Sequence, residues 1–109
     1  MDFVILNHSQ VDDAVASLLG WARVGKQLEA RYAFKTFPDA VSFTCRVAEV
    51  AEELGHHPEW RVAYRDVDLS STTHDAGGLT RLDIELAERV DALARSSGAV
   101  ARRERGADQ

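Results

Sequence analysis

Apolar residues recur at helical spacing in three segments of the chain, and each segment opens with a capping residue. Spacings of three and four residues bring such side chains onto one face of a helix. The caps are Ser9 with Asp12, Thr36 with Asp39, and Thr80 with Asp83. Glycine favours the left-handed conformation that ends helices, and proline cannot continue one. The sequence therefore predicts helices over 9–20, 36–55 and 80–95, the central one closed by Gly55 and Pro58.

Four shorter segments alternate apolar and polar residues, which is the pattern of half-buried strands. The predicted strands are 21–24, 28–35, 60–64 and 67–71, with a tight turn at Arg65-Asp66 between the last two. The order α-β-β-α-β-β-α with hairpin-linked strands predicts an α+β fold: a four-stranded antiparallel sheet with helices packed on one face. We expect one domain over 1–109, with a core at about 9–95 and a flexible tail at 96–109.

Composition narrows the class of protein. The chain has 109 residues, of which 45% are hydrophobic and 28% charged, as in ordinary soluble domains. Its net charge of −5 and the lack of a basic stripe argue against a direct nucleic-acid partner. The apolar run at residues 3–6 is too short for a membrane span, so we expect no membrane partner and a cytoplasmic location. The single Cys45 excludes an internal disulfide and a cysteine-based zinc site, and we predict it as a buried helix residue.

Three of the four histidines lie in one region together with an acid, a proline and a tryptophan. This set comprises Glu52, His56, His57, Pro58, Trp60 and His74. Histidine exchanges protons near neutral pH, and it also binds metals. Adjacent histidines point in different directions and the helical i, i+4 pair is missing, so the spacing disfavours a metal. A plain surface cap remains an alternative for the His56-His57 pair, and a core anchor is an equal alternative to a pocket wall for Trp60.

The predicted elements bring the polar residues toward one rim of the sheet. The central helix ends where His56 begins, and the second hairpin ends near His74. Both ends can meet beside the N-terminus of the last helix, where Asp83 lies. Two histidines there would serve as acid and base, while a carboxylate would bind an amide-like or guanidine-like edge of a ligand.

At these spacings the chain resembles the pterin-4a-carbinolamine dehydratase family. The family pattern is an acid, three residues, His-His-Pro, five residues, an aromatic, nine residues, His, and eight or more residues before Asp. The chain matches with Glu52, His56, His57, Pro58, Tyr64, His74 and Asp83. The resemblance covers about residues 9–95 and includes 31–37 and 78–80. Two positions depart from it: Gly55 stands where many relatives carry a polar residue, and Asp75 stands where Glu is frequent.

The resemblance implies an enzyme that eliminates water from 4a-hydroxytetrahydropterin to give quinonoid dihydropterin, in tetrahydrobiopterin recycling. It implies no metal and no organic cofactor. His56 and His74 would be the catalytic acid-base pair. The implied substrate-binding residues are Glu52, His57, Pro58, Trp60, Thr72, Thr73, Asp75 and Asp83. A homodimer or homotetramer is expected. Some relatives of this fold act instead as a transcription-factor cofactor or as assembly factors, so a non-catalytic binding role is the alternative.

Overall fold

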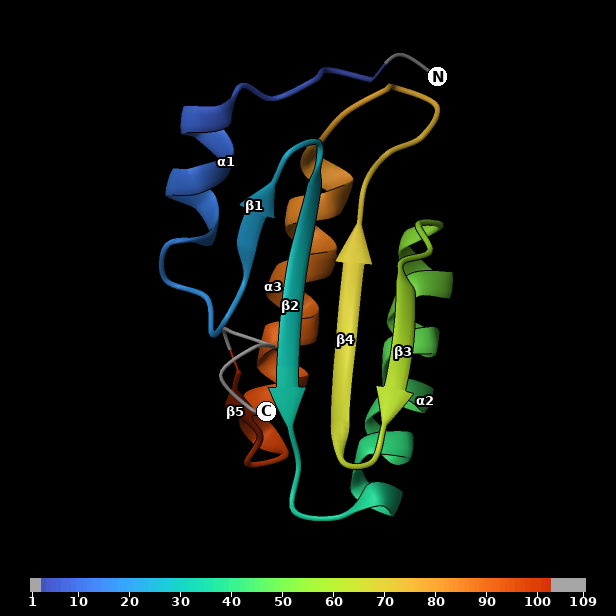
Figure 1. Cartoon of the computed structure of the whole chain (residues 1–109). Helices are drawn as coiled ribbons and strands as arrows, with labels where there is room; N and C mark the ends of the chain where they lie inside the picture. The colour runs from blue at the N-terminus through green and yellow to red at the C-terminus, as the bar shows by residue number, and fades with distance from the viewer. Residues whose placement is uncertain (1–2, 103–109) are drawn as a thin grey trace.

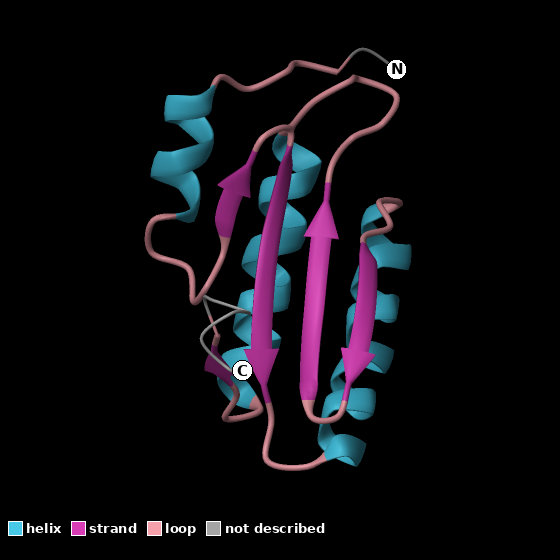
Figure 2. Cartoon of the chain, viewed as in Figure 1, coloured by secondary structure: helices cyan, strands magenta, loops and turns pink. Residues whose placement is uncertain are grey.

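A computed structural model of the chain describes residues 3–102, which form an antiparallel sheet with helices against one of its faces (Figures 1 and 2). In chain order the elements are α1 (His8–Val15), β1 (Ala22–Val24), β2 (Gln27–Ala33), α2 (Phe37–Leu54), β3 (Glu59–Ala63), β4 (Asp66–Ser71), α3 (Arg81–Ser96) and β5 (Val100–Ala101). The α+β class and the antiparallel sheet predicted from the sequence are thereby confirmed.

Within the described residues the sheet has five strands, one more than predicted. The strand order is β1-β2-β4-β3, and β5 pairs with the end of β2 through Tyr32 opposite Ala101. A strand of two residues is too short to show an alternating pattern, which is why the sequence did not reveal it. Residues 96–102 thus belong to α3, the following turn and the sheet, while residues 103–109 lie outside the described part.

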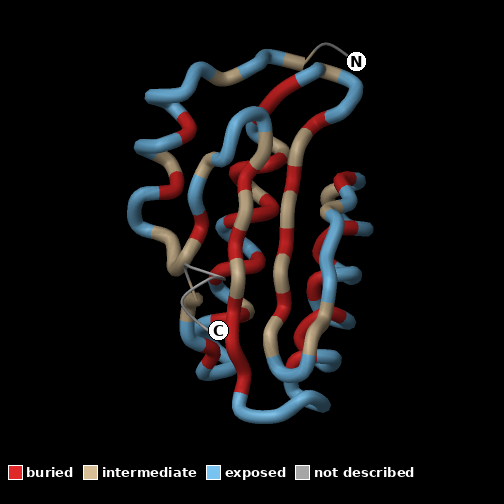
Figure 3. The backbone as a smooth tube through the Cα atoms, in the orientation of Figure 1, coloured by how far each residue is buried: buried red, intermediate tan, exposed pale blue. Residues whose placement is uncertain are grey.

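Strict alternation divides the sheet into a covered face and an open face. On β2 and β4 the residues that face the helices are Leu28, Ala30, Tyr32, Val67, Leu69 and Ser71, all of them buried. Helices α2 and α3 run along this face, and α1 lies at the β1 edge against α3 (Figure 1). Figure 3 shows the buried positions concentrated between the sheet and these helices. Of these six residues two carry a hydroxyl group: Tyr32 on β2 and Ser71 at the end of β4.

Two predictions about the first helix are wrong: the residue that caps its N-terminus and the residue at which it ends. The cap of α1 is Asn7, whose Oδ1 accepts from the Gln10 backbone N at 2.8 Å, so the predicted cap at Ser9 with Asp12 is wrong. Gln10 Oε1 accepts in return from the Asn7 backbone N at 2.8 Å. The helix also ends at Val15, before Gly20.

The second hairpin and Cys45 also differ from prediction. Ala63 pairs with Asp66, so the turn consists of Tyr64 and Arg65 rather than Arg65 and Asp66. Tyr64 has a positive φ of 55° and is 89% exposed. Cys45 is exposed, because the buried positions of α2 lie on the opposite side of the helix. Thr36 and Gly55 cap α2 as predicted.

No helix among residues 3–102 combines the length and the apolar character needed to cross a lipid bilayer.

Candidate active site

The C-terminus of α2 turns His56 into the protein. Gly55 adopts the left-handed conformation with φ 62°, which other residues resist. Its backbone N–H donates to Glu52 O at 3.2 Å, and the His56 N–H donates to Ala51 O at 3.0 Å. These two bonds are the Schellman arrangement that closes many helices. The reversal leaves His56 buried and the next residue, His57, exposed.

His56 meets Asp83, the acid in the capping box of α3. Its Nε2 lies 2.7 Å from Asp83 Oδ1 and 3.2 Å from the Oγ of Ser71, the last residue of β4. The ends of α2 and β4 therefore join the N-terminus of α3, as the sequence predicted for this rim. The contact is shielded from water, since Asp83 is fully buried and His56 is 8% exposed.

Asp83 accepts four hydrogen bonds, two on each carboxylate oxygen. Oδ1 accepts from Ser71 Oγ at 2.6 Å besides the contact with His56, and Oδ2 accepts from Thr73 Oγ1 at 2.7 Å and from the Thr80 backbone N at 2.9 Å. Burying an ionised carboxylate is costly unless hydrogen bonds replace its water shell. These donors replace that shell. We call Asp83, His56, Ser71, Thr73 and Thr80 the Asp83 cluster.

His57 forms a separate, exposed pair with Glu52. Its Nε2 lies 3.2 Å from Glu52 Oε1, and both side chains are mostly in solvent. The pair flanks the C-terminal cap of α2, so it shares the end of the sheet with the Asp83 cluster without belonging to it. A charge pair this exposed contributes little to stability, which leaves both groups available to a ligand.

His74 lies on the loop that connects β4 to α3. Thr73 anchors this loop: its N–H donates to Gly78 O at 3.1 Å, and its carbonyl accepts from Ala76 N at 3.0 Å. The His74 side chain is exposed. Because Thr73 also bonds Asp83, the loop that carries His74 is tied to the cluster that holds His56.

The remaining predicted site residues fall around this end of the sheet with different exposures. Thr72 donates its hydroxyl to Lys26 O at 2.6 Å, Asp75 is exposed, and Pro58 is half-buried. Trp60 pairs with Leu69 in the sheet register, so its side chain lies on the covered face, where it stays 37% exposed. Trp60 is not part of the buried core cluster, and it is among the residues that line the hollow described below, so the core-anchor interpretation is not supported.

Sequence reasoning missed Ser71 as a site residue and treated Thr80 only as a helix cap. A usable signal was present at Ser71, because a hydroxyl occupied a position that the alternation of β4 assigns to the core. For Thr80 the cap was correctly predicted, but its second hydroxyl contact, to Thr73 Oγ1 at 2.8 Å, depends on the tertiary fold.

The part of the chain that the structure describes contains no group of three or more His, Cys, Asp or Glu side chains arranged to hold a metal ion.

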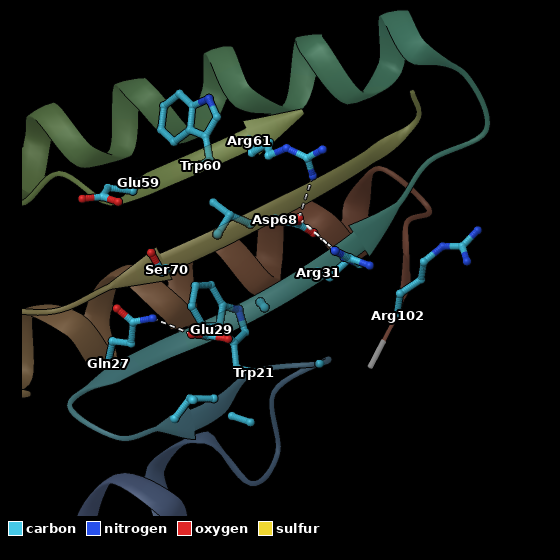
Figure 4. A pocket seen from close by; sticks show the side chains of 15 residues that line it. Trp21, Gln27, Glu29, Arg31, Glu59, Trp60, Arg61, Asp68, Ser70 and Arg102 are labelled. Carbon is cyan, nitrogen blue, oxygen red and sulfur yellow. Dashed lines mark hydrogen bonds and ion pairs between the residues drawn. The ribbon is translucent and has the colours of Figure 1, made fainter. Parts of the chain in front are cut away.

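A separate hollow of about 630 Å³ lies on the open face of the sheet (Figure 4). Two cross-strand rows run across this face. One holds Glu29, Ser70 and Glu59, and the other holds Arg31, Asp68 and Arg61. Asp68 forms ion pairs with both arginines of its row. The buried His56 and Asp83 are not among the residues that line this hollow.

The chain matches the family model described as pterin 4 alpha carbinolamine dehydratase over residues 5–93. A relative from Bradyrhizobium sp. (strain BTAi1 / ATCC BAA-1182), provisionally named pterin-4-alpha-carbinolamine dehydratase, is 51% identical over 86 residues, covering 77% of this chain and 87% of the relative. A relative from Roseiflexus sp. (strain RS-1) with the same provisional name is 40% identical over 88 residues, covering 81% and 95%.

Two solved structures share the fold. A transcriptional coactivator/pterin dehydratase from Brucella melitensis superimposes with a TM-score of 0.79 at 38% identity, covering 84% of this chain and 99% of that one. A pterin dehydratase-like protein identified as a RuBisCO assembly factor in the alpha-carboxysome gives 0.59 at 29% identity, covering 69% and 89%. The resemblance seen in the sequence is thereby confirmed, and the chain belongs to the pterin 4 alpha carbinolamine dehydratase family.

Proposed function

We propose that the protein is a dehydratase that converts 4a-hydroxytetrahydropterin to quinonoid dihydropterin and water by histidine acid-base catalysis. The observation that carries the proposal is the buried His56–Asp83 contact of 2.7 Å, at the end of the sheet where His57 and the His74 loop also lie. Family membership supports the carbinolamine dehydratase activity. The histidine mechanism is the part that needs a direct test.

The reaction needs one proton donor and one proton acceptor. The hydroxyl on C4a leaves as water after an acid protonates its oxygen, and a base removes the proton from N5 while the N5–C4a double bond forms. No electrons are gained or lost overall. We assign the acid-base pair to His56 and His74, one held rigidly and one on an exposed loop.

The exposed groups around the pair would bind the pterin. Glu52 and His57 offer an acceptor and a ring nitrogen at the end of α2. Thr72 and Asp75 flank the His74 loop, and Pro58 shapes the start of β3. We assign Thr73 and Asp83 to support of these groups, since both are buried.

The test is an assay on synthetic 4a-hydroxytetrahydropterin with purified protein. His56→Ala and His74→Ala should each lower kcat by about 10²–10⁴-fold, the usual contribution of a general acid or base. His8→Ala is the matched control, because His8 is an exposed histidine in the first turn of α1. A wild-type rate equal to that of buffer would eliminate the proposal. Addition of a chelator should leave the rate unchanged, and a loss of rate would refute a metal-free mechanism.

We also propose that the protein works as a homodimer or homotetramer in the cytoplasm. β3 is the last strand on its side of the sheet order, and an edge strand offers unpaired backbone groups to a second copy. Light scattering on the purified protein measures the mass directly. A monomer at micromolar concentration would contradict this part of the proposal.

A second candidate function is binding of a protein partner, alone or beside catalysis. The open sheet face with its charged rows favours it, and the two related structures carry names that include a coactivator and a RuBisCO assembly factor. Sedimentation of the protein with purified RuBisCO would detect the assembly role. Arg61→Glu on the open face should weaken such a complex while leaving the dehydratase rate unchanged, and binding that survives this change would place the interface elsewhere.

A further inference from the structure

The hydrogen bonds on the Oδ2 side of the Asp83 cluster have a fixed direction. The backbone N–H of Leu82 donates to Thr80 Oγ1 at 3.3 Å, so the Thr80 hydroxyl proton is left for Thr73 Oγ1 at 2.8 Å. Thr73 then gives its own proton to Asp83 Oδ2 at 2.7 Å. The ionised carboxylate can only accept and Thr73 has a single hydroxyl proton, so Thr73 must accept from Thr80, and this chain of hydroxyls runs one way, toward the carboxylate.

The Oδ1 side runs the same way. Ser71 Oγ donates to Oδ1 at 2.6 Å, which uses its only proton. The Nε2 of His56 thus faces two acceptors, Asp83 Oδ1 at 2.7 Å and Ser71 Oγ at 3.2 Å. A ring nitrogen between two acceptors must carry a proton. The cluster consequently selects the Nε2–H form of His56.

The other ring nitrogen of His56 has a different environment. Within residues 3–102, Nδ1 has no hydrogen-bond partner, and it is not one of the fully buried polar atoms that lack a partner. The side chain keeps 9% of its surface exposed. Nδ1 is therefore the ring nitrogen that a small molecule can reach.

We propose that Ser71, Thr73 and Thr80 are positioning residues that act through Asp83 to fix His56 in the Nε2–H form, so that Nδ1 is the atom that exchanges a proton with the substrate. The inference rests on the proposed function of His56 and names its reacting atom. Neutral His56 accepts a proton at Nδ1 as a base, and the cation returns it as an acid, without rotation of the ring. Thr73, at 4% exposure, acts on the reaction through Asp83 and not by contact with the pterin.

The direct test is a long-range ¹H–¹⁵N NMR spectrum of the free protein with ¹⁵N-labelled histidine, recorded above the pH at which histidine is protonated. We expect His56 to show a protonated, pyrrole-type Nε2 and an unprotonated Nδ1, with assignment from the His56→Gln spectrum. A pyrrole-type Nδ1 would overturn the proposal. Because the spectrum needs no substrate, it separates failure of this inference from failure of the dehydratase proposal.

Two variants test the positioning roles, each with a matched control. Ser71→Ala and Thr73→Val should let the Nδ1–H form appear, displace the pH–rate profile and lower kcat about tenfold with KM unchanged. Thr73→Ser keeps the hydroxyl, so it should show the wild-type tautomer, pH–rate profile and kcat. Recovery in this variant would show that the hydroxyl, and not the methyl group, is responsible. The controls are Ser70→Ala, on the open face, and Thr44→Val, whose hydroxyl bonds Val41 O at 2.7 Å. If Ser71→Ala and Thr73→Val leave the wild-type tautomer and pH profile, the positioning roles are wrong.

Discussion

Helix α3 buries two aspartates, Asp83 in its first turn and Asp91 two turns later, and their neighbours differ in kind. Asp91 Oδ1 accepts from the Leu19 backbone N at 2.8 Å and from Tyr32 Oη at 3.3 Å. Its Oδ2 accepts from Arg95 Nε at 2.9 Å. Asp83 instead receives hydroxyls, one backbone N–H and the imidazole of His56.

The difference lies in the cation. Arg95 is charged at every physiological pH, so the charge of Asp91 is balanced permanently. The cation available to Asp83 is a histidine, the residue type whose charge changes near neutrality. One carboxylate therefore fastens the segment after α1 and strand β2 to α3, while the other sits beside a group that can take up and release a proton. Under the proposed mechanism, the same residue type, buried on the same helix, has a structural role at Asp91 and supports the reaction at Asp83.

Exchange of each aspartate for asparagine should separate the two roles by the largest margin. Asp83→Asn places an amide N–H₂ among donors and releases His56, so kcat should fall by about 10²-fold or more. Asp91→Asn should lower the free energy of unfolding by about 1–3 kcal/mol, the cost of unsatisfied buried partners, with kcat retained in the folded enzyme. Urea unfolding and kcat measured well below Tm provide the two readouts. An equal loss of kcat in both variants would show that the two aspartates do not differ in their roles.

Tyr32 makes the Asp91 site sensitive to alkali. Burial, and after it the charge of Asp91, raises the pKa of Tyr32 above its ordinary value of about 10. Above that pH an unfolded chain loses the phenol proton while the folded chain keeps it. The stabilisation is therefore complete below about pH 10 and is lost at about 1.4 kcal/mol per pH unit as the pH rises toward the folded-state pKa.

Urea unfolding between about pH 8 and pH 11 checks this expectation. At the lower pH, Tyr32→Phe should be less stable than wild type by about 1 kcal/mol because it lacks the hydrogen bond to Asp91. The gap should close as the pH rises, since phenylalanine has no proton to lose. Tyr64→Phe is the control, at a tyrosine that is 89% exposed. A gap that stays constant with pH would show that Tyr32 ionises equally in both states.

Removal of the Arg95 guanidinium should have the smallest effect on the stability of the protein. The hydrogen bond from Arg95 to Asp91, and then the charge of Asp91, raises the pKa of Arg95. The guanidinium is largely in solvent, however, so its contribution to stability is screened. Arg95→Gln should lower Tm by less than Asp91→Asn does, and added salt should shrink the difference from wild type. Calorimetry at two salt concentrations measures Tm and its dependence on salt. If Arg95→Gln lowers Tm by more than Asp91→Asn does, the view that hydrogen bonds are the main support of Asp91 is wrong.

Elements with strong local signals were predictable from the sequence. The caps at Thr36 and Thr80 and the helix end at Gly55 follow from hydrogen bonds and dihedral angles within a few residues. The alternation in β4 likewise placed Val67 and Leu69 in the core. Where two local signals compete, prediction failed: both Asn7 and Ser9 are good helix caps, and the structure uses Asn7.

The candidate site was only partly predictable. The histidine spacing and the family resemblance singled out His56, His74 and Asp83 and predicted that the elements carrying them would meet. They did not reveal which histidine is buried, or that Ser71 completes the surroundings of His56. The catalytic and binding roles of all these residues stay predictions until the variants are assayed.

The sequence by itself determined the helices, the alternating strands and the family of this protein, because caps, periodicity and fixed motif gaps are local properties of a chain. Only the tertiary structure decided that Asp83 meets His56, 27 residues away, while Asp91 meets Leu19, 72 residues away. Both are acids on one helix, and α3 itself supplies only the cation of Asp91, because Arg95 lies four residues further along the same helix. The other side-chain partners come from β2, β4 and the loops, including the segment after α2 that carries His56, and packing of those elements places a histidine beside Asp83 and not beside Asp91.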